Sequence, residues 1–203
     1  MRLLLASTAD GAELRRRLDK LCSAADIDEL VAFYRGLPLY PDPAQHVLRA
    51  AEGVRSNMRV VFEAVAHRNP YPAEHFVESA WNQMVLKALF VGTRLDLIAG
   101  LDARANPALA RMLSDYAHER WAASRPVSPE LWRCVGPFAT GAVLDDFRRL
   151  LERGTGIEKQ AAALALATAE DAGAKALLAS HPALAEAARA GRLDWEALAT
   201  AGT

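Results

Sequence analysis

Side chains that can bind anions or transfer protons gather between Asp115 and Phe138, in the run DYAHERWAASRPVSPELWRCVGPF. The run contains three arginines, one histidine and two tryptophans. Arginine suits carboxylates and phosphates because its parallel N–H donors match two oxygens at once. We therefore expect an anion-binding or docking corner here, with candidate residues Arg104, Glu119, Arg120, Arg125, Trp132 and Arg133.

Arg120 is the clearest departure from an amphipathic pattern in the helix expected over residues 107–124. At about 100° per residue it falls inside the apolar arc, beside Leu113 and Ala117. A buried guanidinium without a partner is too costly to tolerate. Arg120 therefore either reaches past the edge of the core at the helix C-terminus, or points into a cleft and meets an anion. An ion pair with Glu119 would make the cluster structural.

A second candidate surface lies on a long helix expected from Ala73 to about Val91. One broad face of this helix is apolar, and the other carries Asn82, Gln83 and Lys87. The simple interpretation is a face exposed to solvent. Apolar side chains share that face, so the alternative is the lining of a groove that binds a ligand.

Several kinds of catalytic site find no support in the sequence. The five histidines are dispersed, and His118–Glu119 lacks a second histidine one turn away, so no metal site is predicted. No glycine-rich phosphate loop, nucleophile elbow or dinucleotide fingerprint is present, and no cofactor is expected. Cys134 has no neighbouring base in the sequence and is interpreted as a buried, inert thiol.

Composition limits the class of protein. The chain has 203 residues, 52% of them hydrophobic and 24% charged, which is typical of a globular domain. Its net charge of −1 gives no reason to expect nucleic acid as a partner. No window is long and apolar enough for a membrane span, and the N-terminal apolar run is too short for a signal peptide. With only two cysteines, a cytoplasmic protein is expected.

The elements that must position these residues are all predicted to be helices. Asp26, Asn106 and Thr155 are expected to cap helices, as is Asp42 before Pro43. Three glycines are expected to end helices: Gly92, Gly100 and Gly136. The predicted fold is all-α, built from stacked antiparallel helix pairs as a HEAT/armadillo-like α-solenoid or as an irregular helical bundle. We expect one domain over residues 1–203, with a helical core at about 43–153 and an Ala-rich helical tail at 155–203.

Three runs of sequence also carry a family resemblance. They are AAEGVRSNMR at residues 50–59, AWNQMVLKALFVG at 80–92, and residues 101–138, which include RWAASRPVSPELWR. Together they resemble the EboA family of bacterial metabolite-traffic proteins, over most of residues 50–151. The resemblance implies a component of a small operon that moves a secondary-metabolite precursor toward the periplasm. The neighbouring proteins would be prenyltransferase-like, TatD-like, sugar-isomerase-like and dehydroquinate-synthase-like. It supplies a context and no catalytic mechanism.

These observations favour a non-enzymatic helical adaptor. It would bind an anionic metabolite, or partner proteins of the same operon, on a concave face built from the 82–87 helix and the 120–133 corner. The alternative is an enzyme that modifies the metabolite precursor, with Glu119 or His118 as acid or base. A third possibility is a purely structural subunit.

Overall fold

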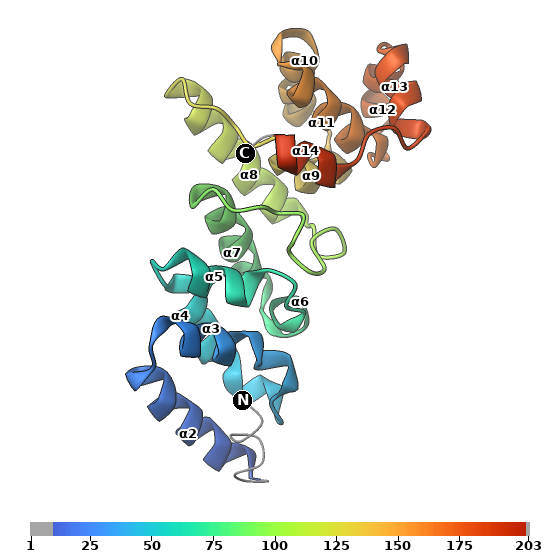
Figure 1. Cartoon of the computed structure of the whole chain (residues 1–203). Coiled ribbons are helices and arrows are strands. Elements are labelled where there is room, and N and C mark those ends of the chain that lie inside the picture. Colours follow the sequence, from blue (N-terminus) through green and yellow to red (C-terminus); the bar gives the residue numbers. More distant parts are fainter. Residues whose placement is uncertain (1–9, 202–203) are drawn as a thin grey trace. The chain divides into compact units, whose positions relative to one another are not determined.

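The computed structural model describes residues 10–201, and every regular element in that range is helical (Figure 1). Helices make up 71% of the structure, and the described residues form no strand, only an isolated bridge between His67 and Ile98. The all-α prediction is therefore confirmed. None of the described helices has the length and apolar character needed to cross a membrane. The stacked-pair arrangement stays a prediction.

The chain divides into two compact units, which are described separately. Unit 1 comprises the residues up to Thr93 together with Leu97–Gly100, and unit 2 comprises Arg94–Asp96 and the residues from Leu101 onward. The helices of unit 1 are α2 (Gly11–Ala24), α3 (Ile27–Arg35), η1 (Leu37–Leu39), η2 (Pro43–His46), α4 (Val47–Arg55), α5 (Arg59–Ala66), α6 (Tyr71–His75) and α7 (Glu78–Phe90). Helix α5 packs against both α3 and α4 and supplies buried residues to the core.

Local capping explains where some of these helices begin. Asp26 accepts from the backbone N–H of Glu29, whose side chain accepts in turn from the N–H of Asp26, so the predicted cap of α3 is a complete capping box. The cap predicted at Asp42 is wrong. Asp42 has φ of 50° and no capping hydrogen bond from its side chain, and Pro43 opens the short 3-10 helix η2 instead of α4.

The single long helix expected from Ala73 to Val91 is also wrong, because the chain leaves helical geometry at Phe76 and Val77. Both residues are extended, which separates α6 from α7. The break allows the side chain of Phe76 to be 5% exposed in the core while that of Val77 is 67% exposed. Neither glycine nor proline marks this position, so the break depends on tertiary contacts.

Unit 2 is organised around one alanine-rich helix. Its elements are α8 (Pro107–Ala122), α9 (Leu131–Val135), η3 (Gly136–Phe138), α10 (Ala142–Arg153), α11 (Gly156–Ala167), α12 (Ala172–Ala179), α13 (Pro182–Arg189) and α14 (Trp195–Ala201). Helix α11 contacts α9, η3, α10, α12, α13 and α14. Four of its alanines are fully buried, and their small side chains allow these neighbours to approach closely: Ala161, Ala162, Ala163 and Ala165.

The three predicted glycine stops have different outcomes. Gly92 follows α7 with φ of 68°, as a helix-ending glycine should. Gly100 has φ of 77° but lies in a turn away from any helix end. Gly136 has φ of −50°, so it does not need the left-handed region. A Cβ atom at Gly136 would lie 2.3 Å from the backbone oxygen of Ala165, so close contact with α11 requires glycine here.

Candidate anion-binding pocket

The predicted corner after α8 is held together by its own hydrogen bonds. Arg120 is half-buried in the last turn of α8, and its Nε donates to the carbonyl oxygen of Pro126 at 2.9 Å. Glu119 and Arg125 are exposed, and no ion pair joins Glu119 to Arg120 among the described residues. The structure thus matches the first of the two explanations of Arg120, in which the guanidinium reaches past the core at a helix C-terminus.

The remaining corner residues also have structural partners. Arg133 forms a bidentate ion pair with Asp102, at 2.6 Å for both N–H donors. Trp132 is fully buried and stacks on Trp121, with ring centroids 5.6 Å apart. Arg104 is half-buried in the loop before α8. The guanidinium of Arg133 is therefore already engaged within unit 2.

The three candidates on α7 belong to unit 1, whereas the corner residues belong to unit 2. Asn82 is buried and so does not belong to a solvated face, whereas Gln83 is exposed. The Lys87 ammonium donates to the carbonyl oxygens of Val54 at 2.5 Å and Ser56 at 2.8 Å. These carbonyls lie at the end of α4, so Lys87 caps that helix.

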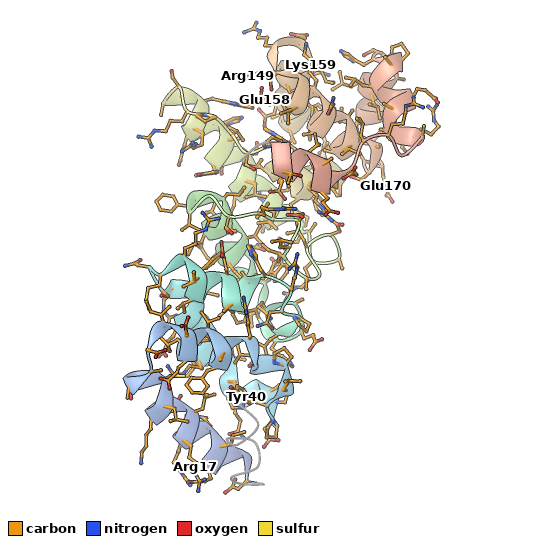
Figure 2. The ribbon with its side chains drawn as sticks, in the orientation of Figure 1. Arg17, Tyr40, Arg149, Glu158, Lys159 and Glu170 are labelled. Atoms are coloured by element: carbon orange, nitrogen blue, oxygen red, sulfur yellow. The ribbon has the colours of Figure 1, made fainter. Side chains whose placement is uncertain are left out.

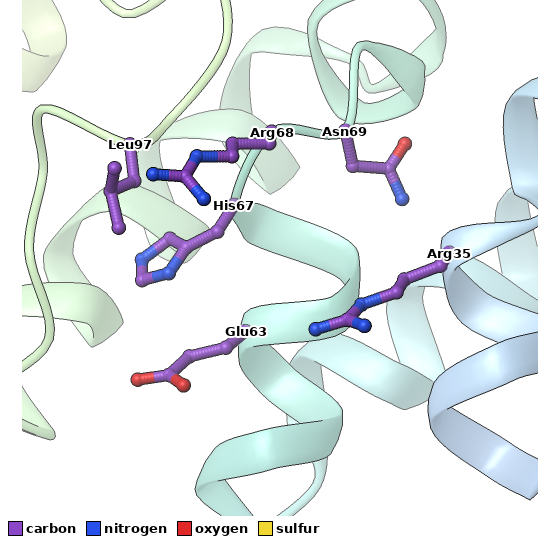
Figure 3. A pocket seen from close by; sticks show the side chains of 6 residues that line it. All are labelled: Arg35, Glu63, His67, Arg68, Asn69 and Leu97. Atoms are coloured by element: carbon purple, nitrogen blue, oxygen red, sulfur yellow. The ribbon is translucent and has the colours of Figure 1, made fainter. Parts of the chain in front are cut away.

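A polar pocket in unit 1 brings together residues that sequence reasoning did not select. Its volume is about 410 Å³, within the range of small-molecule sites. Figure 3 shows Arg35 on α3 and Glu63 on α5, with His67, Arg68 and Asn69 on the turn after α5 and Leu97 on a separate loop. The lining residues are Arg35, Glu63, His67, Arg68, Asn69 and Leu97.

The backbone at Arg68 is held in an unusual conformation. Arg68 has φ of 50°, in the left-handed region that residues with a Cβ rarely occupy. Its N–H donates to the carbonyl oxygen of Leu97 at 2.7 Å, beside the antiparallel bridge between His67 and Ile98. These contacts fix the direction in which the Arg68 side chain leaves the turn.

Asn69 forms hydrogen bonds with the backbone near both Arg35 and Arg68. Its side-chain Nδ2 donates to the carbonyl oxygens of Tyr34 at 3.1 Å and Ala64 at 3.0 Å, and its Oδ1 accepts from the N–H of Tyr71. Tyr34 precedes Arg35, and Asn69 itself follows Arg68. The amide is 3% exposed and sets the backbone on both sides of the pocket. It is a positioning residue, because both of its N–H hydrogens are used and no donor is left for an anion.

A short chain of hydrogen bonds orients His67. Thr93 Oγ1 donates to Glu63 Oε1 at 2.7 Å and lies 3.2 Å from His67 Nε2. Since the hydroxyl has one hydrogen and gives it to Glu63, the His67 contact is a hydrogen bond only when Nε2 carries a hydrogen. Burial opposes ionisation of Glu63, but hydrogen bonds from Arg59 and Thr93 outweigh this effect and lower its pKa. Glu63 is therefore a carboxylate that Arg59 already neutralises.

The charge that remains in the pocket is positive. Among the described residues, no ion pair engages the guanidinium of Arg35 or of Arg68. Arg35 is the last residue of α3 and Arg68 follows the end of α5, and a positive charge at a helix C-terminus gains about 0.3–1 kcal/mol from the helix dipole. The left-handed backbone of Arg68 costs about 1–2 kcal/mol, so the dipole alone does not account for an arginine there. Strain at a position that faces a pocket is typical of a functional residue.

The described residues contain no group of three side chains suited to hold a metal ion. The pocket instead offers nitrogen donors to a ligand with oxygen acceptors. None of the six lining residues is among the site residues predicted from the sequence. The one available signal was the pair of basic residues, His67 and Arg68, directly before the Asn-Pro turn.

Comparison with known proteins gives one match. The family model described as Metabolite traffic protein EboA matches residues 1–136. The match includes all the pocket residues and ends within unit 2. No curated protein and no solved structure matches the chain.

Proposed function

Because the chain belongs to the EboA family of metabolite traffic proteins, we propose that it binds a small anionic metabolite in the pocket of Arg35 and Arg68. In this role the pocket of unit 1 is a non-enzymatic adaptor site, which holds the metabolite and presents it to partner proteins. The adaptor role predicted from the sequence is kept. The proposed binding site differs from the one predicted from the sequence: it is the pocket of unit 1 and not the corner after α8.

One observation carries the proposal: two guanidinium groups, both without a carboxylate partner among the described residues, line the same polar pocket. The surrounding geometry supports it, since Asn69 fixes the backbone beside each arginine. A guanidinium group favours a carboxylate or phosphate because its parallel N–H donors match two oxygens at once.

Calorimetric titration with sodium pyrophosphate and with benzoate tests the binding step directly. We expect saturable binding of at least one probe. Arg35→Ala and Arg68→Ala should each weaken it about ten- to hundredfold, because a hydrogen bond to a charged group contributes about 1.5–3 kcal/mol. Arg55→Ala is the matched control, since Arg55 is also the exposed last residue of a helix but lies outside the pocket. Equal losses in all three variants would refute a specific pocket.

The partners proposed are proteins of the same operon: prenyltransferase-like, TatD-like and sugar-isomerase-like. In support, the exposed large hydrophobic side chains of the described region all belong to unit 1, including Leu48 at 74% and Phe90 at 77%. A pull-down with these proteins tests the adaptor role. We expect at least one to be retained, and to be released by Phe90→Ser without loss of pyrophosphate or benzoate binding. Retention of none of them would contradict it.

A further inference from the structure

A buried carboxylate in unit 2 orients an exposed histidine. Asp146, on α10, accepts from Ser114 Oγ at 2.6 Å and from His118 Nε2 at 2.6 Å. Ser114 and His118 are one turn apart on α8, so both reach the same side chain. The Asp146 side chain is 8% exposed, whereas that of His118 is 55% exposed. In this hydrogen-bonded pair, Asp146 therefore lies in the core and His118 faces solvent.

These contacts fix which nitrogen of His118 carries the hydrogen. A carboxylate only accepts hydrogen bonds, so Nε2 must be the donor to Asp146. The lone pair of the neutral ring is then on Nδ1, which has no hydrogen-bond partner among the described residues. A histidine whose donor nitrogen is held by a carboxylate, with its other nitrogen open, can act as a base or nucleophile. In the serine-protease triad the carboxylate holds Nδ1 and Nε2 reacts, whereas in His118 the two nitrogens exchange these roles.

The aromatic side chains next to His118 limit its movement. The rings of His118 and Trp121 lie 5.7 Å apart, and Trp121 stacks on the buried Trp132. The guanidinium carbon of Arg149 lies 4.1 Å from the centre of the Trp121 ring. Arg149 lies on α10 and is labelled in Figure 2. It is exposed and has no ion-pair partner in the part of the chain that the structure describes. A cation is thus fixed on the same tryptophan that borders the imidazole.

We propose that His118 is a nucleophilic catalytic residue for acyl transfer from activated esters, with Asp146 as its positioning residue and Arg149 as a contact for anionic substrates. Nδ1 attacks the carbonyl carbon, the bond to the leaving oxygen breaks, and that oxygen departs with the electron pair. The acyl-imidazolium carries a positive charge that Asp146 balances. Water then attacks the acyl group, which leaves as a carboxylic acid. The second proton of that water passes through solvent to the departed oxygen anion, which restores neutral His118. This activity is independent of the anion pocket in unit 1.

A structural role would need no more than a hydrogen-bond donor beside the buried Asp146, so the test must separate donation from nucleophilicity. The probe is p-nitrophenyl acetate with the full chain. We expect p-nitrophenolate release at least tenfold faster than with N-acetylhistidine at equal concentration. His118→Gln keeps an N–H donor for Asp146 and should lose this rate. The control His181→Gln alters another histidine of unit 2 and should retain it.

Asp146→Asn should lower the rate about tenfold and change its dependence on pH between 5 and 8, because the charge that balances the imidazolium is lost. Mass spectrometry of the quenched reaction should find acetyl on His118, a result that does not depend on whether the Asp146 variant folds. Acetylation elsewhere, or a wild-type rate in His118→Gln, would overturn the proposal.

Discussion

Replacing Arg68 with glycine should separate the fold of unit 1 from its proposed ligand. Arg68 is exposed, and its side chain forms no ion pair among the described residues. Within the described residues, Arg68 holds the turn through the hydrogen bond from its backbone N–H to the carbonyl oxygen of Leu97. Glycine keeps that bond and adopts φ of 50° without steric cost. The substitution therefore removes strain and the guanidinium together.

The expected effect on stability is small and favourable. The left-handed backbone costs a residue with a Cβ about 1–2 kcal/mol, which glycine avoids. Glycine also gives the unfolded chain more freedom, which costs about 0.5–1 kcal/mol. The difference leaves Arg68→Gly about 0.5 kcal/mol more stable than the natural protein. Arg68→Ala keeps the strain and should therefore be about 0.5 kcal/mol less stable than Arg68→Gly.

Urea unfolding followed by circular dichroism, in a buffer without phosphate, measures these differences. Binding of the anionic probes should be lost in both Arg68 variants, although one is more stable than the natural protein. A loss of more than about 1 kcal/mol in Arg68→Gly would mean that the side chain supports the fold. Equal stability of the glycine and alanine variants would refute the claim of strain.

Three further predictions concern groups outside the pocket. Glu130 accepts hydrogen bonds from the backbone N–H groups of Leu95 and Asp96 at 2.7–3.1 Å. Glu130→Ala should therefore lower the free energy of unfolding by about 2–5 kcal/mol, and Glu130→Gln should lower it by less. Equal losses for the two variants in urea unfolding would contradict this role of Glu130. Burial lowers the pKa of His46 below its ordinary 6.5, so the neutral ring is favoured in the fold. Stability should therefore fall as the pH drops below about 6.5, and His46→Gln should remove this slope. Burial raises the pKa of Cys134 to about 12, so this thiol should not react with Ellman's reagent at pH 8 until the protein unfolds; reaction in the native state would contradict the burial.

Local features of the fold could be predicted from the sequence because they depend on neighbouring residues. The structure confirms the caps at Asp26, Asn106 and Thr155, each of which accepts a hydrogen bond from the backbone of its own helix. The break at Phe76 and Val77 could not be predicted, because it depends on which side chain packs into the core and not on local helix propensity.

The candidate site was harder to predict because it joins distant parts of unit 1. Arg35 ends α3, and Arg68 follows α5; only the contact between these two helices brings them to one pocket. The helical pattern identified Arg120 as exceptional, and its hydrogen bond to Pro126 supplies the reason. His118 was identified from the sequence, but its partner Asp146 lies on α10. Spacing rules relate residues within one helix, so they could not identify this pair.

The central claim is that Arg35 and Arg68 bind one anion together. Nuclear magnetic resonance of the arginine Nε–H groups during a titration with pyrophosphate tests it most directly. The signals of Arg35 and Arg68 should shift together along one saturation curve, while that of Arg55, which lies outside the pocket, stays in place. Shifts of similar size in all three arginines, without saturation, would show only screening of surface charge and would contradict the claim.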